Sequence, residues 1–402
     1  MMRRVRSPRD AAAGLWLATV LACAGCAPVA YGLRSSVPQD KGENRVQAPP
    51  VPAAAPRAAL HARLTLLASR HGICHADLAV IRHRELQSVD AGYGCAGDAY
   101  AAANQEHVFQ AASLGKPLFA YAVLKLVQQG KMDLDAPVLD YLPRGYAHRQ
   151  VAYLADSAID QVTDPALPAV TVRMALNHTA GLPGWSNGPL AFDARPGARW
   201  QYSGEGYLLL QRAMEEVTGE PFGAFMQRTV FGPLGMTHSA YTREARLEPY
   251  IVPGTNDQGP TLTLPPFREP VAAFTLYTSA RDYGRFLSAL LKDERSLRQI
   301  AASPVPVSPR LGLDWGSGWG LERHQGDVFL WHWGNNPGYR AFAMVSPRSG
   351  DGFVMFTNSE SGMALARPIS EEVFGVSHPV FQYHLLRDGL DNLLCEMLDA
   401  CR

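Results

Sequence analysis

Strand-like segments lie near both ends of this 402-residue chain, and helical patterns fill the middle. Residues 74–95 contain two such segments around a polar turn at His83–Glu85, and four more fall within residues 319–358. Between them, residues 205–218 and 279–291 place apolar side chains at helical spacing. Strands that are distant in sequence can pair in one sheet, so this order predicts an α+β fold, with an antiparallel sheet flanked by helices plus a mainly helical region.

The same order predicts one large domain over residues 59–402. Residues 59–112 and 300–402 would supply the sheet part, and residues 113–299, roughly, the helical part. Residues 27–58 contain six prolines and many alanines without an apolar period, which is typical of a disordered linker.

The first 26 residues have the pattern of an export signal. Four arginines within residues 3–9 precede an uncharged stretch over residues 11–27. The stretch ends in small residues around Cys23 and Cys26, which resembles the lipobox of bacterial lipoproteins, with Cys26 as the lipid anchor that we expect. Cys23 and an unlipidated signal peptide are the alternatives. We therefore expect a periplasmic location, with membrane contact only through this N-terminal anchor.

The cysteines left after processing at Cys26 are even in number, as expected in an oxidising compartment. A hairpin centred on residues 83–85 would set Cys74 opposite Cys95, so we predict that disulfide. Cys395 and Cys401 lie six residues apart near the C-terminus, and they either pair or remain free thiols.

Ser113 and Lys116 stand at the start of a strongly apolar segment with helical character. Residues three apart share a helix face, so the hydroxyl and the amine would project together. Burial lowers the pKa of a lysine, and a neutral amine can take the proton of a serine nucleophile. The alternative is a chance S-x-x-K pattern with an exposed lysine. A phosphate-binding loop is excluded because Gln110 and Pro117 occupy its required Gly and Ser/Thr positions.

Four further segments extend this pattern into a family resemblance. Residues 109–143, FQAASLGKPLFAYAVLKLVQQGKMDLDAPVLDYLP, resemble the nucleophile helix and following loop of the class C β-lactamase family, which also contains DD-carboxypeptidases and family VIII esterases. MALNHTAGLPG, PGARWQYSGEGYLLLQ, YTSARDYGRFLSALL and WHWGNNPGY are similar to later family segments in the same order. The resemblance covers most of residues 60–360 and implies a β-lactamase/DD-peptidase-like fold.

By this resemblance Ser113 is the acylated nucleophile and Lys116 is its hydrogen-bonded partner. Tyr202 matches the family tyrosine that shuttles protons to and from the nucleophile and the leaving group. Because a phenol titrates near 10, we expect cationic neighbours to favour its anion. Deacylation would also run through Tyr202, since no counterpart of the class A glutamate is found.

The resemblance also places His332 and Gly334 on the strand that flanks the acyl pocket, with His332 in place of the usual lysine. The backbone amides of Ser113 and Asn335 would form the oxyanion hole. Gly204 replaces an asparagine that contacts the substrate in many β-lactamases. Losing that amide and the permanent cation weakens the case for efficient β-lactam hydrolysis.

The sequence therefore predicts an exported serine hydrolase that transfers acyl groups from esters, D-amino-acid peptides or β-lactams to water, without metal or cofactor. The alternative is a non-catalytic lipoprotein that keeps the pocket and binds penicillin or wall fragments. The 37 basic and 37 acidic residues balance, which disfavours nucleic acid as a partner and favours a small molecule or peptide.

Three other segments contain residue types that occur in functional sites. GWSNG at residues 184–188 matches a nucleophile elbow, but such an elbow needs a strand before and a helix after it. HGICH at residues 71–75 has ligand-like spacing without a second cluster, so we expect no metal. His178 is taken as a structural histidine.

Overall fold

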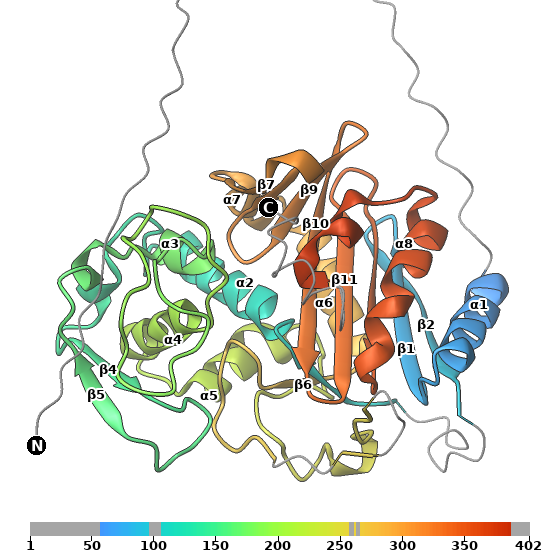
Figure 1. The fold of residues 1–402 in the computed structure, drawn as a ribbon, viewed down its shortest axis with the longest axis horizontal. Helices are drawn as coiled ribbons and strands as arrows, with labels where there is room; N and C mark the ends of the chain where they lie inside the picture. Colours follow the sequence, from blue (N-terminus) through green and yellow to red (C-terminus); the bar gives the residue numbers. More distant parts are fainter. Residues whose placement is uncertain (1–56, 96–105, 257–260, 263–265, 387–402) are drawn as a thin grey trace, which may run out of the picture. The chain divides into compact units, whose positions relative to one another are not determined.

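The computed structural model describes residues 57–95, 106–256, 261–262 and 266–386 (Figure 1). The predicted export signal with Cys23 and Cys26, nearly all of the 27–58 linker, and the pair Cys395 and Cys401 lie outside the described residues. Arg57 and Ala58, assigned above to the linker, already belong to the first helix, α1 (Arg57–Arg70). Among the described residues, no helix combines the length and apolarity that a membrane span requires.

The core of the fold is an eight-stranded antiparallel sheet with the order β2-β1-β12-β11-β10-β9-β8-β7. Its strands are β1 (His75–Arg82), β2 (Glu85–Tyr93), β7 (Val305–Ser308), β8 (Leu313–Trp315), β9 (Gly320–His324), β10 (Asp327–Asn336), β11 (Tyr339–Ser346) and β12 (Asp351–Thr357). β1 pairs with β12, so strands from both ends of the domain lie side by side in one sheet. The predicted α+β fold is confirmed.

The β1–β2 hairpin turns at His83 and Arg84, which both adopt positive φ. Its register pairs His75 with Tyr93. Cys74 lies one residue before His75 and Cys95 lies two residues after Tyr93. They form a disulfide with their Cα atoms 4.6 Å apart, as predicted from the hairpin.

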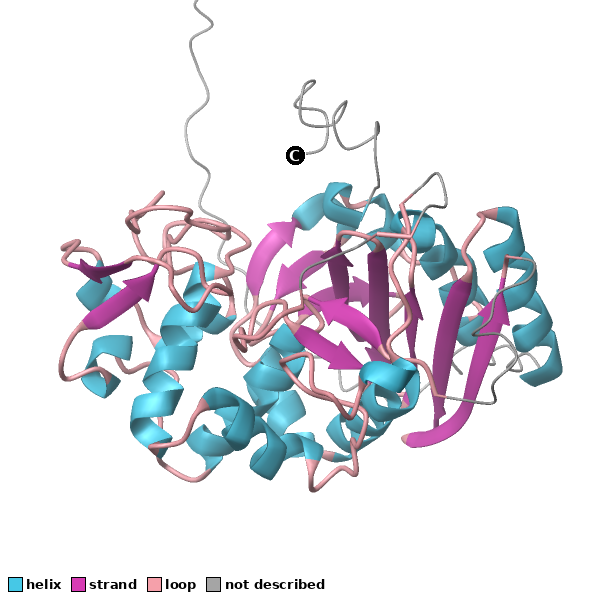
Figure 2. Cartoon of the chain, turned by 90° about the horizontal axis from the view of Figure 1, so that it is seen from below, coloured by secondary structure: helices cyan, strands magenta, loops and turns pink. Residues whose placement is uncertain are grey.

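Helices cover both faces of the sheet (Figures 1 and 2). On β1, Leu78 and Val80 join an apolar cluster with α1 and α8 (Ala366–Phe374), while Ala79 and Ile81 join the larger cluster that contains α2 and α6. The alternation follows from the two-residue period of a strand. α6 (Ala280–Lys292) lies within the range predicted as the helical region, yet it packs on β1, β2 and β12.

The remaining elements build the helical region beside the sheet. They are α2 (Gly115–Gln128), α3 (Val172–Leu176), α4 (Glu205–Thr218), α5 (Phe222–Met226) and α7 (Glu294–Ala301), with two ribbons, β3 (Phe109–Ala112) with β6 (Leu276–Thr278) and β4 (Tyr146–Arg149) with β5 (Ile159–Val162). Short helical segments complete the fold. Four lie in the helical region, η1 (Val138–Tyr141), η2 (Leu167–Ala169), η3 (Gln227–Phe231) and η4 (Glu248–Tyr250), and four follow strands of the sheet or α8, η5 (Pro309–Leu311), η6 (Glu360–Leu365), η7 (Pro379–Gln382) and η8 (His384–Leu386).

Candidate active site

Ser113 lies in the sharp turn between β3 and α2. The turn starts at Ala112, whose φ of 50° is unusual for a residue with a side chain. β3 lies against β10 at Gly334, where an added Cβ would come within 2.2 Å of the Ala111 carbonyl oxygen. Only glycine permits this approach, which brings the end of β10 beside the nucleophile turn.

Lys116 is fully buried one helical turn after Ser113. Its Nζ donates to Ser113 Oγ at 3.1 Å and to the Ala273 carbonyl at 2.8 Å. Burial lowers the pKa of Lys116 to about 7, so a large fraction of the amine is neutral near neutral pH. The rings of Tyr202 and Tyr207, 4.7 and 5.6 Å from Nζ, form part of the wall around it.

The Tyr202 hydroxyl is buried and makes no hydrogen bond of standard geometry within the described part of the chain. Burial raises the pKa of Tyr202, and its interaction with the Ser113 side chain opposes this only in part. At neutral pH the side chain is therefore a phenol. This differs from the expectation that cationic neighbours would favour the phenolate, because the cost of burying the anion is the larger effect.

His178 is a structural histidine that also packs against the Tyr202 ring. Its Nδ1 accepts a hydrogen bond from the Ser203 amide at 3.1 Å, and its ring lies 4.4 Å from the Tyr202 ring. His178 also has a positive φ, 61°, which is rare for a non-glycine residue. The order N-H-T-A-G before the tyrosine segment was the available signal for this positioning residue.

His332 is a buried neutral imidazole. Its Nδ1 lies 2.9 Å from the Trp333 carbonyl, which can only accept, so Nδ1 carries the proton. Burial, with the nearby Lys116 charge, lowers the pKa of His332 to about 3. The resemblance placed His332 beside the acyl pocket in place of a lysine. The structure brings its ring within 6.2 Å of the Tyr202 ring, but it carries no charge there.

Ser113 opens into a cleft of about 290 Å³. Asn335 and Asn336 at the end of β10 also line it. β9 pairs with β10 only as far as Trp331, so the described sheet has no strand beside Asn335 on that edge. Asn336 donates to the Gln110 side chain at 2.9 Å and thereby ties this edge to β3. The predicted oxyanion residues Ser113 and Asn335 thus line one cleft.

A tryptophan covers the position of the missing asparagine. A Cβ added at Gly204 would lie 2.5 Å from Trp185 Cη2, so the indole occupies the space that any side chain there would need. Trp185 belongs to the GWSNG segment, which is a loop without a preceding strand or following helix. Ser186 donates its hydroxyl to the Gly188 carbonyl at 2.8 Å. The segment is therefore a wall of the cleft rather than a nucleophile elbow.

A buried histidine and two carboxylates hold that wall. His148 lies between Asp160 and Glu205, with Nδ1 and Nε2 at 3.0 and 3.1 Å from their oxygens. Burial lowers the pKa of His148, but the bonds to Glu205 and Asp160 outweigh it, and the net shift is upward. Glu205, the second residue after Ser203, also accepts the Ser186 amide at 2.8 Å. Sequence spacing gave no signal for this cluster.

Three described side chains lie as close together as the ligands of a metal ion. They are Glu106, His238 and Asp282, whose candidate ligand atoms lie within 4.8 Å of one another. Asp282 already accepts the His238 amide at 2.7 Å and pairs with Arg285, while Glu106 pairs with Arg281. Arginines thus supply the positive charge, and the group closes the N-terminus of α6. In the HGICH segment Cys74 is held in the disulfide and is not available as a ligand.

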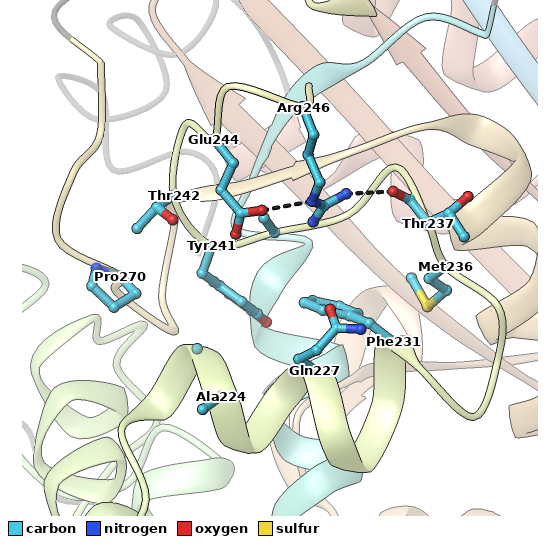
Figure 3. Close-up of a pocket in the computed structure, with 12 residues that line it drawn as sticks. Ala224, Gln227, Phe231, Met236, Thr237, Tyr241, Thr242, Glu244, Arg246 and Pro270 are labelled. Carbon is cyan, nitrogen blue, oxygen red and sulfur yellow. Dashed lines mark hydrogen bonds and ion pairs between the residues drawn. The ribbon is translucent and has the colours of Figure 1, made fainter. Parts of the chain in front are cut away.

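A second cavity, of about 640 Å³, is not lined by Ser113 (Figure 3). It is lined by residues of α5, η3 and the following loop, including Phe231 and Tyr241. Arg246 at its rim is engaged by Glu244 and the Thr237 carbonyl. The smaller cleft, and not this cavity, contains the candidate chemistry.

Residues 65–374 match the family model described as Beta-lactamase. The chain belongs to the β-lactamase family. Its homologues share the serine β-lactamase-like fold, and the order of the segments around Ser113, Tyr202 and His332 agrees with this assignment.

Curated relatives in the family have different names. Putative penicillin-binding protein PbpX of Bacillus subtilis is 29% identical over 46% of this chain and 46% of its own length. Esterase EstB of Burkholderia gladioli is 29% identical over 37% of this chain and 42% of its own. The chain therefore spans about half the length of these relatives. Penicillin-binding protein 4 of Amycolatopsis lactamdurans is 25% identical over 78% of this chain and 88% of its own length.

Solved structures confirm the family fold. D-alanine carboxypeptidase AmpC from Burkholderia cenocepacia superposes with a TM-score of 0.65 at 16% identity, covering 79% of this chain and 98% of that one. A D-stereospecific amidohydrolase from Streptomyces gives a TM-score of 0.63 at 23% identity, covering 80% and 100%. At these identities the similarity establishes the β-lactamase/DD-peptidase fold alone.

Proposed function

We propose that this β-lactamase-family protein hydrolyses esters or amides with uncharged leaving groups through an acyl-enzyme on Ser113. Ser113 Oγ attacks the carbonyl carbon, the amides of Ser113 and Asn335 stabilise the oxyanion, and the leaving alcohol or amine departs with a proton. Water then attacks the ester and releases the acid, which restores the Ser113 hydroxyl. The observation that supports this best is the 3.1 Å contact between Ser113 Oγ and the buried amine of Lys116.

Lys116 is the general base in this proposal, and Tyr202 is the proton relay. A base is most effective when its pKa lies near the working pH, and the pKa of Lys116, about 7, meets that condition. Tyr202 has a raised pKa, so it acts as a phenol that passes a proton to the leaving group. In deacylation the same groups would work in reverse, with Tyr202 and Lys116 taking the proton of the incoming water.

The preference for uncharged leaving groups rests on His332. A neutral imidazole with its proton engaged by the Trp333 carbonyl offers no cation to a substrate carboxylate. The names of the relatives include an esterase and amidohydrolases, which fits esters and amides as substrates.

The test uses the purified protein with p-nitrophenyl acetate and a fluorescent penicillin. Ser113→Ala should lower ester turnover by about 10³-fold or more, since the nucleophile is removed. Ser69→Ala, an exposed serine on α1, is the matched control. Ser186→Ala tests the competing serine: full activity in Ser113→Ala together with loss in Ser186→Ala would overturn the assignment. Stable penicillin labelling without turnover of either compound would instead support a binding protein.

We further propose that residues 1–26 direct export and that Cys26 carries the lipid anchor. The pattern of arginines, an uncharged stretch and small residues before Cys26 supports this. In a bacterial host fed radiolabelled palmitate, Cys26→Ala should abolish labelling, while Cys23→Ala should preserve it. The opposite result would move the anchor to Cys23, and no labelling of the parent protein would refute lipidation.

A further inference from the structure

We propose that Trp185, Phe274 and Tyr153 form an aromatic subsite that binds an aromatic or flat apolar acyl group next to Ser113. All three side chains line the cleft that contains Ser113. The inference rests on the proposed function, because it concerns the acyl part of the substrate that Ser113 would attack.

The first support is the exposure of apolar surface inside this cleft. Trp185 and Tyr153 are 47% and 43% exposed, although large aromatic side chains usually bury most of their surface. Both contact Phe274 edge-on, with ring centroids 4.9 and 5.8 Å away. An apolar ligand that covers exposed rings in a concave site buries their apolar surface, which makes its binding free energy more favourable.

The second support is that Trp185 is held in place on both sides. Gly184 accepts the Gly204 amide at 2.8 Å, and the Ser186 amide donates to Glu205 at 2.8 Å. Both partners belong to the start of α4, and His148 in turn binds Glu205. The indole is therefore positioned before substrate arrives, which reduces the entropy cost of binding.

The third support is the absence of a side chain at Gly204. A Cβ there would collide with the indole at 2.5 Å, so the glycine and the tryptophan depend on each other. The family position that often carries a polar amide is thus replaced by an aromatic face. This replaces a hydrogen bond to a polar acyl group with apolar contact.

The position that the leaving group must take assigns the acyl group to this subsite. The leaving group must meet Tyr202, which relays its proton in the proposed function, whereas Trp185, Phe274 and Tyr153 line the cleft around Ser113. The cleft on the Trp185 side is then the space left for the acyl group. Glu205, its charged wall residue, is bound by His148 and is not free to attract a cationic group.

The kinetic experiment compares p-nitrophenyl phenylacetate with p-nitrophenyl acetate, which share one leaving group. We expect the parent protein to favour the phenylacetate by about tenfold or more in kcat/KM, a range that contact with one aromatic group can supply. Trp185→Ala and Phe274→Ala should each lower this ratio by about fivefold or more, because the loss falls mainly on phenylacetate turnover. Leu154→Ala is the control, because Leu154 is 45% exposed beside Tyr153 and does not line the cleft.

Gly204→Ala should disturb the same subsite without changing Trp185 itself. Its new methyl group displaces the indole, so the ratio should fall as in Trp185→Ala, and the double variant should show no further loss. Additive losses in the double variant would show that Gly204 and Trp185 act separately and would overturn the coupling. Equal kcat/KM for the two esters in the parent, or an unchanged ratio in Trp185→Ala, would overturn the subsite.

A binding measurement separates this inference from the proposed function. Calorimetry with Ser113→Ala should detect phenylacetamide with an affinity at least about tenfold above that for acetamide, and Trp185→Ala on the same background should remove the difference. If acetate hydrolysis is absent or survives Ser113→Ala, the proposed function fails while this binding result still tests the subsite. If hydrolysis through Ser113 is present but the two amides bind equally, the subsite alone fails.

Discussion

Lys116 approaches Ser113 to 3.1 Å from a position that solvent does not reach, and its second hydrogen bond goes to the Ala273 carbonyl. Burial lowers the pKa of Lys116, and the two hydrogen-bond acceptors of its amine are an uncharged hydroxyl and an uncharged carbonyl. The fold itself therefore keeps the pKa of the Lys116 amine near neutral pH. This relationship between Ser113 and Lys116 determines how activity and stability should depend on pH.

Activity should rise with pH through the pKa of Lys116. The base works as the neutral amine, so kcat/KM for p-nitrophenyl acetate should increase up to about pH 7 and level off above it. His332, with a pKa of about 3, stays neutral across this range and does not contribute. The measurement is kcat/KM from pH 5 to 9 at constant ionic strength, corrected for ester hydrolysis without enzyme. A flat profile, or activity that still rises steeply between pH 8 and 9, would remove Lys116 as the base.

Replacing Lys116 by methionine should abolish turnover and change the pH dependence of stability. The pKa of Lys116 is about 7 in the folded protein and ordinarily 10.5, so the unfolded chain binds one more proton between these values. Wild-type stability should therefore rise with pH across this window. Below pH 7 the buried cation costs the most, and Lys116→Met should gain about 1–3 kcal/mol relative to wild type.

Urea unfolding at pH 6, 8 and 10 checks this. The stability difference between Lys116→Met and wild type should be largest at pH 6 and shrink as the pH rises. Lys125→Met is the matched control, since Lys125 pairs with Asp293 and its pKa is raised, so its removal should not produce this trend. A difference that stays constant from pH 6 to 10 would show that Lys116 is not protonated differently in the two states.

The parts of the site that the sequence predicts are those set by local spacing. Ser113 and Lys116 are three residues apart on one helix, and the alternating runs near both ends indicate the strands and the Cys74–Cys95 hairpin. Family resemblance adds Tyr202 and His332, because the order of segments is retained.

The remaining features depend on contacts that spacing does not reveal. Trp185 reaches over Gly204 from a loop nineteen positions earlier, and His148 meets Glu205 across a separation of 57 residues. The charge state of Tyr202 is a further example, because only burial in the folded protein shows that the phenol is favoured over its anion. Such properties follow from three-dimensional packing and not from residue type.

Tyr202→Phe should slow turnover with little loss of stability. Removing the proton relay is expected to lower kcat by about 10²–10⁴-fold. The hydroxyl has no standard hydrogen-bond partner among the described residues, so its loss leaves no buried group newly unpaired. Stability should change by less than about 1 kcal/mol. The rise in activity near pH 7 should persist in the slow variant, because it belongs to Lys116. Parent-like kcat would exclude Tyr202 from the mechanism, and loss of the pH 7 limb would assign that limb to Tyr202.

Removing the Cys74–Cys95 disulfide should lower stability without impairing catalysis. The bond closes a loop across a sequence separation of 21 residues, and a loop of this size is expected to contribute about 2–4 kcal/mol by restricting the unfolded chain. Neither cysteine lines the cleft around Ser113, and the β1–β2 ladder remains hydrogen-bonded without it. Urea unfolding of the Cys74→Ala/Cys95→Ala variant should therefore show a lower midpoint at unchanged slope, with ester kcat/KM within about twofold of the parent at 25 °C.

Reduced parent protein should match the variant, since reduction opens the same loop. Equal midpoints for the oxidised parent and the variant would show that the cross-link adds nothing, and free thiols at both positions in peptide mapping of the oxidised protein would show that it does not form.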